Sequence, residues 1–239
     1  MKKKLIAIAF ITGLALFGIA GMAQAALVTI GTATYGGSDY NLIWDDDNNG
    51  NSVVWLDYSN APTNWSNQNT WAAGLDGNLT YNIDAAYNVS WEGNWRLGNT
   101  VDGEYVYGYD GSTTAGYNIT SSEMGHLFYE ELGNLGYYDT SGEFQPGYGL
   151  KNTGDFNHLI AFRYWSSTEC AYNTNLAWML NMGDSYQGNG VKNTIEAYGL
   201  ALRSGQVSST APVPVPPTIF LLGSGLLGII GIKTRKKRS

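Results

Sequence analysis

The spacing of apolar and polar positions predicts several short β-strands along the chain. β-Branched and apolar residues predict a first strand over residues 26–35. The apolar runs 40–44 and 52–57 flank a stretch of Asp, Asn and Gly, so together they predict a β-hairpin with an acidic loop. Further short strands are predicted in the last third of the chain, at residues 158–165, 176–182 and 198–203.

Two helices are predicted from the three- and four-residue spacing of apolar positions. The first follows Thr63 or Asn64 as its cap and ends before Gly77. The second follows a capping box at residues 120–123 and ends at Gly133. Residues 76–118 are rich in Gly, Asn and Tyr, and are predicted to be loops and edge strands. Two helices followed by short strands predict an α+β domain whose function resides in its long loops.

The amino end of the chain has the pattern of a secretory signal peptide. Three lysines precede a long apolar run, and Ala23-Gln24-Ala25 has the small-residue pattern of a cleavage site. Residues 1–25 are therefore predicted to be removed after Ala25, with an uncleaved N-terminal anchor as the alternative. Export excludes a role in cytosolic metabolism.

The carboxyl end predicts association with a membrane. A proline-rich linker, residues 208–217, precedes an apolar run at residues 218–232 that predicts a short transmembrane segment. The basic tail, residues 233–239, predicts a cytoplasmic end. The domain at residues 26–207 is therefore predicted to lie outside the cytoplasm.

This carboxyl end resembles the PEP-CTERM class of bacterial sorting signals, in the variants that begin Val-Pro-x-Pro. Besides the basic tail, the resemblance is carried by Val213, Pro214, Pro216, Gly223 and Gly225. It implies processing by an exosortase, a transpeptidase-like membrane enzyme of bacteria that make extracellular polysaccharide. The protein is then expected to be anchored transiently in the membrane and afterwards to reach the cell surface or the extracellular matrix. A plain C-terminal anchor is the alternative.

Charge is distributed unevenly along the chain. The 13 Lys+Arg and 20 Asp+Glu give a net charge of −7. The domain holds all 20 acids but only five cations, so it carries −15. It lacks the basic stripe that neutralises phosphates, which excludes nucleic acid as a partner. The single cysteine, Cys170, cannot form an intramolecular disulfide and is predicted to be buried or incidental, not catalytic.

Several sequence phrases, in a fixed order over residues 40–205, resemble the bacterial family named after the C-terminal domain of the collagen-like adhesin Lcl. The strongest phrase is Tyr164-Trp165-Ser166-Ser167-Thr168-Glu169, and others are Val53-Val54-Trp55-Leu56-Asp57, Trp95-Arg96-Leu97 and Ala201-Leu202-Arg203-Ser204-Gly205. Their order is more specific than any one of them. The resemblance implies a C-type-lectin-like fold, with two helices on small twisted antiparallel sheets and long loops that present the ligand face. The adhesin that names the family is linked to sulfated polysaccharides. A domain of net charge −15 repels polyanions, so we expect neutral glycans or protein partners instead.

The acidic loop of the hairpin is a candidate Ca²⁺ site. Asp45, Asp47, Asn49 and Asn51 place oxygen ligands at alternate positions, as at the start of a calcium-binding loop. The twelfth position is Leu56, where an EF-hand requires Glu, so the loop is not an EF-hand. A solvated hairpin turn is the alternative.

A second candidate site combines aromatic rings for stacking on a ligand with polar groups for hydrogen bonds. Its members are Tyr172, Asn173, Asn175, Asn181, Asp184, Tyr186 and Gln187. Trp165 and Trp178 lie in apolar runs and are predicted to belong to the core instead.

Acid–base chemistry finds no support in the sequence. His126 is predicted to be a surface or capped histidine one turn from Glu130, and His158 a core residue. Glu130 and Glu131 point in different directions on a helix, so they cannot act as a catalytic pair. We therefore expect a non-enzymatic adhesion or matrix protein that binds extracellular glycan or a surface protein. A structural matrix component without a specific ligand, and a hydrolase of extracellular polysaccharide, are the alternatives.

Overall fold

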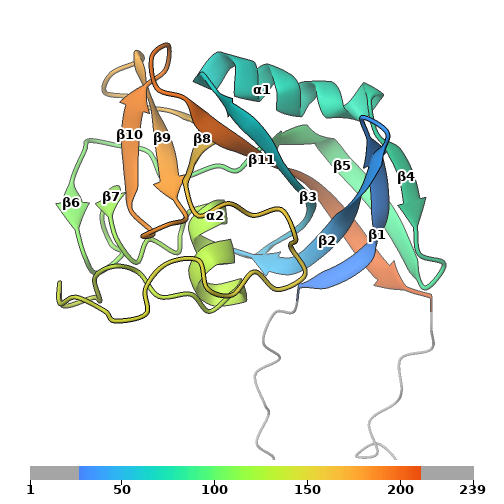
Figure 1. Ribbon diagram of the computed structural model, residues 1–239, viewed down its shortest axis with the longest axis horizontal. Coiled ribbons are helices and arrows are strands. Elements are labelled where there is room, and N and C mark those ends of the chain that lie inside the picture. Colours follow the sequence, from blue (N-terminus) through green and yellow to red (C-terminus); the bar gives the residue numbers. More distant parts are fainter. Residues whose placement is uncertain (1–26, 211–239) are drawn as a thin grey trace, which may run out of the picture.

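The computed structural model describes residues 27–210, which fold around one large mixed β-sheet (Figure 1). Its strands are β1 (Val28–Tyr35), β2 (Ser38–Asn48), β3 (Asn51–Thr63), β4 (Thr80–Ile83), β5 (Tyr87–Leu97), β6 (Tyr107–Gly108), β7 (Ala115–Gly116), β8 (Arg163–Glu169), β9 (Leu176–Asn181), β10 (Gln187–Val191) and β11 (Ala197–Ser209). The helical elements are α1 (Trp65–Gly74), the 3₁₀ turn η1 (Leu75–Gly77), α2 (Glu123–His126) and the π-helical turn η2 (Leu127–Glu131).

Strand β11 is the junction of the sheet. The strands run in the order β4-β1-β2-β3-β11-β8-β9-β10-β7-β6, and β5 also pairs with β11. One edge of β11 pairs with β3, while the other pairs first with β8, at Tyr198, and then with β5, from Ala201 to Ser209. The β11–β8 and β6–β7 pairs are parallel, and the other pairs are antiparallel. A single long strand therefore joins the two halves of the sheet.

The predicted hairpin and first helix are confirmed. Strands β2 and β3 pair through a turn at Asn49 and Gly50, which both have positive φ (53° and 80°), as a two-residue Asn-Gly turn requires. Helix α1 starts after Asn64, whose side chain accepts a hydrogen bond from the backbone N–H of Asn67 at 3.0 Å. The buried Gln68 fixes α1 to the sheet, because its Nε2 donates to carbonyl oxygens on β3 and β11.

The core lies on both faces of the sheet. Val54 and Leu56 of β3 pack in one apolar cluster with α1, while Val53 and Trp55 pack in a second cluster with α2 and η2. Successive side chains of a strand point to opposite faces, so β3 is buried on both sides. The prediction that Trp165, Trp178 and Cys170 are buried is also confirmed.

The predicted α+β, C-type-lectin-like arrangement of two helices on small antiparallel sheets is wrong, because strands dominate and join one mixed sheet. Residues 76–118, predicted to be loops and edge strands, contain β4, the short β6 and β7, and the 11-residue β5, which is longer than predicted. Exposed Gly93 and Asn94 interrupt the alternation of β5, and its pairing partner β11 lies more than 100 residues away. The predicted second helix has one α-helical turn after the cap Ser122 and then continues as η2.

The described residues include the start of the predicted linker but neither terminal signal. Strand β11 continues to Ser209, and the backbone N–H of Thr210 donates to Ala86 O at 2.8 Å. Between Leu27 and Thr210 the structure holds no helix with the length and apolar character needed to cross a membrane. The predicted signal peptide, the transmembrane segment at 218–232 and the basic tail lie outside the described residues.

Candidate functional site

Aromatic side chains around β6, β7 and the β9–β10 hairpin form one continuous set of contacts, which we call the tyrosine network. Its members are Tyr105, Tyr107, Tyr109, Tyr117, Tyr137, Tyr138, Phe144, Tyr148, Tyr172, Trp178 and Tyr186. Tyr105 stacks on Trp178, and its hydroxyl is hydrogen-bonded to that of Tyr186. Tyr105, Tyr107 and Phe144 are 42%, 44% and 52% exposed, so the network presents rings to solvent.

Backbone and hydroxyl contacts hold the tyrosine network in place. β6 and β7 approach so closely that a Cβ on Gly116 would lie 1.9 Å from Gly108 O, and Gly116 has a φ of +114°. Only glycine fits there. Tyr129, at the helical segment, accepts a hydrogen bond from the backbone N–H of Asn118 at 2.7 Å and donates to Ser185 Oγ at 2.6 Å. These bonds link the network to the second core cluster, where Tyr129 packs.

A small cavity of about 190 Å³ opens beside the tyrosine network. It is lined by Arg163, Met179, Asn181, Tyr186, Gly188 and Asn189. Burial, and then the bond with Tyr105, raise the pKa of Tyr186, so its hydroxyl is neutral at physiological pH. The cavity therefore offers an aromatic ring, two side-chain amides and one guanidinium group to a ligand.

The structure brings together part of the predicted ligand-binding set. Asn181 and Tyr186 line the cavity, and Tyr172 Oη accepts a hydrogen bond from the lining residue Asn189 at 2.6 Å. Asp184 holds the β9–β10 turn, where it accepts from the backbone N–H of Tyr186 at 3.0 Å.

The other predicted members have different places. Gln187 is buried and donates to Thr114 O at 3.0 Å, while Asn173 and Asn175 are exposed in the turn between β8 and β9. Arg163 and Asn189 were not predicted as binding residues, because nothing in the local sequence pattern shows that β8 and β10 border the same cavity.

The four predicted Ca²⁺ ligands do not form one site. A register shift between Asp45 and Asn48 interrupts the β2–β3 pairing, so Asp45 is buried while Asp47, Asn49 and Asn51 are exposed. Asp47 Oδ1 accepts from the backbone N–H of Gly50 at 3.0 Å, and Asn51 Nδ2 donates to the carbonyl oxygen of Asn49 at 3.2 Å. These three side chains belong to the turn, as the alternative reading of the loop expected.

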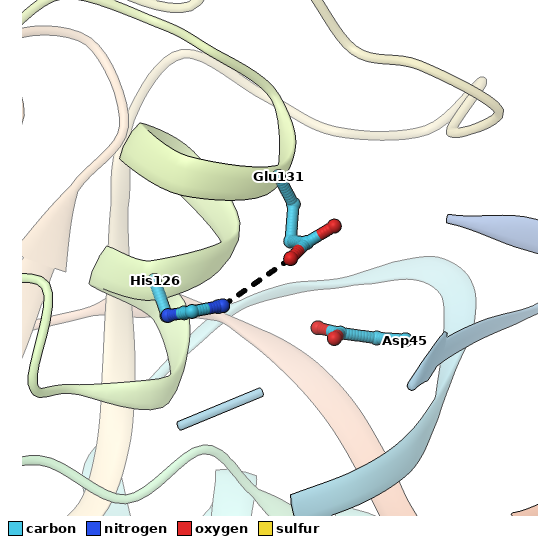
Figure 2. Close-up of side chains that lie close together, drawn as sticks. All are labelled: Asp45, His126 and Glu131. Atoms are coloured by element: carbon cyan, nitrogen blue, oxygen red, sulfur yellow. Dashed lines mark hydrogen bonds and ion pairs between the residues drawn. The ribbon is translucent and has the colours of Figure 1, made fainter. Parts of the chain in front are cut away.

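Asp45 instead faces two residues of the helical segment, His126 and Glu131, and we call these three residues the buried cluster (Figure 2). His126 Nε2 lies 3.2 Å from Glu131 Oε1, and one ligand atom from each of the three residues lies within 4.8 Å of the others. The predicted partner of His126 was Glu130, which is exposed. As predicted, Glu130 and Glu131 point in different directions.

The environment of the buried cluster disfavours negative charge. Burial, the largest influence, acts together with the nearby Asp45, Asp46 and Asp47 to raise the pKa of Glu131 to about 7. Burial also raises the pKa of Asp45, although hydrogen bonds from Asn48 and Trp55 oppose this effect. Two carboxylates therefore share a poorly solvated space with one imidazole.

Comparison with models of protein families, with curated proteins and with solved structures found no match to this chain. The candidate sites are therefore judged on their own chemistry. Cys170, the single thiol, is buried, and burial raises its pKa to about 11, so it is protonated at neutral pH. His158 is half-exposed, contrary to its predicted core position, and its ring lies 3.1 Å from Asp57 Oδ2. The cavity beside the tyrosine network has the groups expected of a ligand-binding surface.

Proposed function

We propose that the protein is an exported cell-surface or extracellular-matrix protein that binds neutral glycan in the cavity beside the tyrosine network. The observation that carries the proposal is the convergence of Tyr186, Asn181 and Asn189 at this cavity, next to exposed tyrosine rings. Sugar rings offer apolar faces that pack on aromatic rings and hydroxyl groups that bond with amides. The secretory and sorting patterns, and the resemblance to the adhesin-derived family, support an extracellular role.

The charge of the domain favours a neutral ligand. Its net −15 creates a repulsive field for sulfated or uronic-acid polymers. Arg163 is the one cation among the residues that line the cavity. A single guanidinium group suits a hydrogen bond with a sugar hydroxyl, whereas a polyanion requires a row of cations.

A glycan array at physiological salt, with the purified protein, tests this function. We expect saturable binding to neutral oligosaccharides, which Asn189→Ala weakens about tenfold through loss of hydrogen bonds from the amide. Asn193→Ala is the matched control, because Asn193 is exposed in the turn after β10 and does not line the cavity. Binding restricted to heparin-like polymers, or binding that Asn189→Ala leaves unchanged, would refute the proposal.

A further inference from the structure

We propose that Asp45, His126 and Glu131 bind a divalent metal ion of the first transition series, with Zn²⁺ as the best match. The three side chains come from two separate parts of the chain, Asp45 from β2 and the other two from the segment formed by α2 and η2. Figure 2 shows all three pointing into the same space. The site is distinct from the glycan-binding cavity, so the two proposals stand or fall separately.

Unpartnered oxygen atoms mark this place in the core. Five buried side-chain polar atoms lack a hydrogen-bond partner between residues 27 and 210. Two of them, Asp45 Oδ1 and Glu131 Oε2, belong to the buried cluster. A third is Asn48 Oδ1; the amide nitrogen of the same side chain donates a hydrogen bond to Asp45 Oδ2 at 2.8 Å. Asp45 is fully buried and the Glu131 side chain is 2% exposed. Buried oxygens without partners are costly, and a cation bound here would satisfy them.

The charge at the cluster also calls for a cation. Asp46, Asp47 and Glu130 add further negative charge around Glu131. Within residues 27–210, the lysine and arginine side chains that form ion pairs do so with carboxylates outside the cluster, namely those of Glu123, Glu169 and Asp76. A divalent ion would balance the two buried carboxylates, which His126 alone cannot do.

Two local irregularities of the backbone assemble the ligands. In an α-helix, residues five apart point about 140° from one another, so His126 and Glu131 would diverge. In η2 the N–H of Leu132 donates to the carbonyl oxygen of Leu127, five residues earlier, at 2.9 Å. This wider turn brings Glu131 around to His126. The irregular pairing of β2 similarly leaves Asp45 buried while Asp47 is exposed. Both kinds of irregularity are frequent at functional sites.

The donor atoms select the metal. One imidazole nitrogen and two carboxylates suit zinc, whereas calcium requires six to eight oxygen ligands. Tetrahedral zinc with bonds of about 2.1 Å separates its ligand atoms by roughly 3.3 Å. The 3.2 Å between His126 Nε2 and Glu131 Oε1 already matches this separation. A metal ion here would also tie the β2–β3 hairpin to the helical segment.

Calorimetric titration and thermal melting of the protein test the site, with metal removed by EDTA and with no polyhistidine tag. We expect one Zn²⁺ per chain and a melting temperature about 5–10 °C higher at a Zn²⁺ concentration 100 times the Kd. Ca²⁺ should leave the melting temperature unchanged. Glu131→Gln should weaken Zn²⁺ binding at least tenfold, while Glu130→Gln, which removes the neighbouring exposed carboxylate, should not.

Three results would overturn the proposal. The first is the absence of Zn²⁺ binding by the metal-free protein. The second is equal Zn²⁺ affinity of the Glu131→Gln and Glu130→Gln variants, which would place the ion elsewhere. The third is a larger rise in melting temperature with Ca²⁺ than with Zn²⁺. Circular dichroism of Glu131→Gln in EDTA shows whether the variant is folded, and His126→Asn provides a second ligand variant if it is not.

Discussion

The Glu131 carboxylate should destabilise the metal-free protein at neutral and alkaline pH, so Glu131→Gln should stabilise it there. Burial and, secondarily, the neighbouring carboxylates raise the pKa of Glu131 from 4.5 to about 7. Below pH 4.5 the carboxyl group is protonated in both the folded and the unfolded chain, and it adds no pH dependence. As the pH rises toward 7, the unfolded chain releases the proton more readily than the folded chain, and the folded state loses stability.

The size of this effect follows from the change in pKa. The difference between 4.5 and about 7 corresponds to a loss of about 3 kcal/mol once the pH exceeds 7. Glutamine has nearly the same shape and carries no charge, so the variant avoids this loss. We therefore expect Glu131→Gln to exceed the natural protein in unfolding free energy by about 1–3 kcal/mol at pH 8, and to match it at pH 4.

Urea denaturation in EDTA at a series of pH values measures this difference directly. Glu130→Gln serves as the control, because Glu130 is exposed and its loss should change stability by less than about 0.5 kcal/mol. Addition of Zn²⁺ should reverse the order, since the natural protein gains a ligand that the variant lacks. A Glu131→Gln variant that is less stable than the natural protein at pH 8 in EDTA would refute the reasoning, because it would mean that the buried carboxylate is already stabilised within the protein.

Two further predictions concern buried polar groups elsewhere in the domain. Gln68→Ala should lower the unfolding free energy by about 2–4 kcal/mol, because it leaves the carbonyl oxygens of Ala61 and Ala197 without their donor. Gln206→Ala, at an exposed position of β11, should change the unfolding free energy little. Equal effects of the two substitutions in urea denaturation would contradict this role of Gln68. Cys170 should resist iodoacetamide at pH 8 and react only after denaturation, since burial shields the thiol and raises its pKa to about 11. Rapid labelling of the folded protein, measured by mass spectrometry, would disprove this.

Local signals predicted the elements whose structure depends on nearby residues. The Asn-Gly turn, the cap at Asn64 and the apolar runs around Trp165 and Trp178 each act within a few residues, and the structure has the hairpin, the first helix and the buried tryptophans. The full length of β5 and its pairing partner were not predicted, because both depend on pairing with β11, which the local pattern does not show. Without knowledge of that pairing, the order of the strands in the sheet could not be predicted from the sequence.

The buried cluster could not be predicted from the sequence, because it depends on two backbone irregularities that depart from regular helix and strand spacing. A spacing of five residues between His126 and Glu131 fits neither a helix face nor a strand face. Regular alternation along β2 groups Asp45 with Asp47, whereas the register shift separates them. The candidate Ca²⁺ loop therefore contained one residue of the cluster and placed it with the wrong partners.

Strand β11 also decides how the domain responds to mechanical force. Of its 13 residues, Ala197 to Ser204 are held by β3 on one edge, and β8 and β5 pair along the other edge as far as Ser209. A pull directed along this strand would load the β5 edge first, at residues 205–209, and then the hydrogen bonds of both edges in shear, from Ser204 back to Ala197. The resistance to such a pull then depends on the unfolding rate constant and not on the equilibrium free energy of unfolding. The last strand of the domain is therefore built to carry tension into the centre of the sheet.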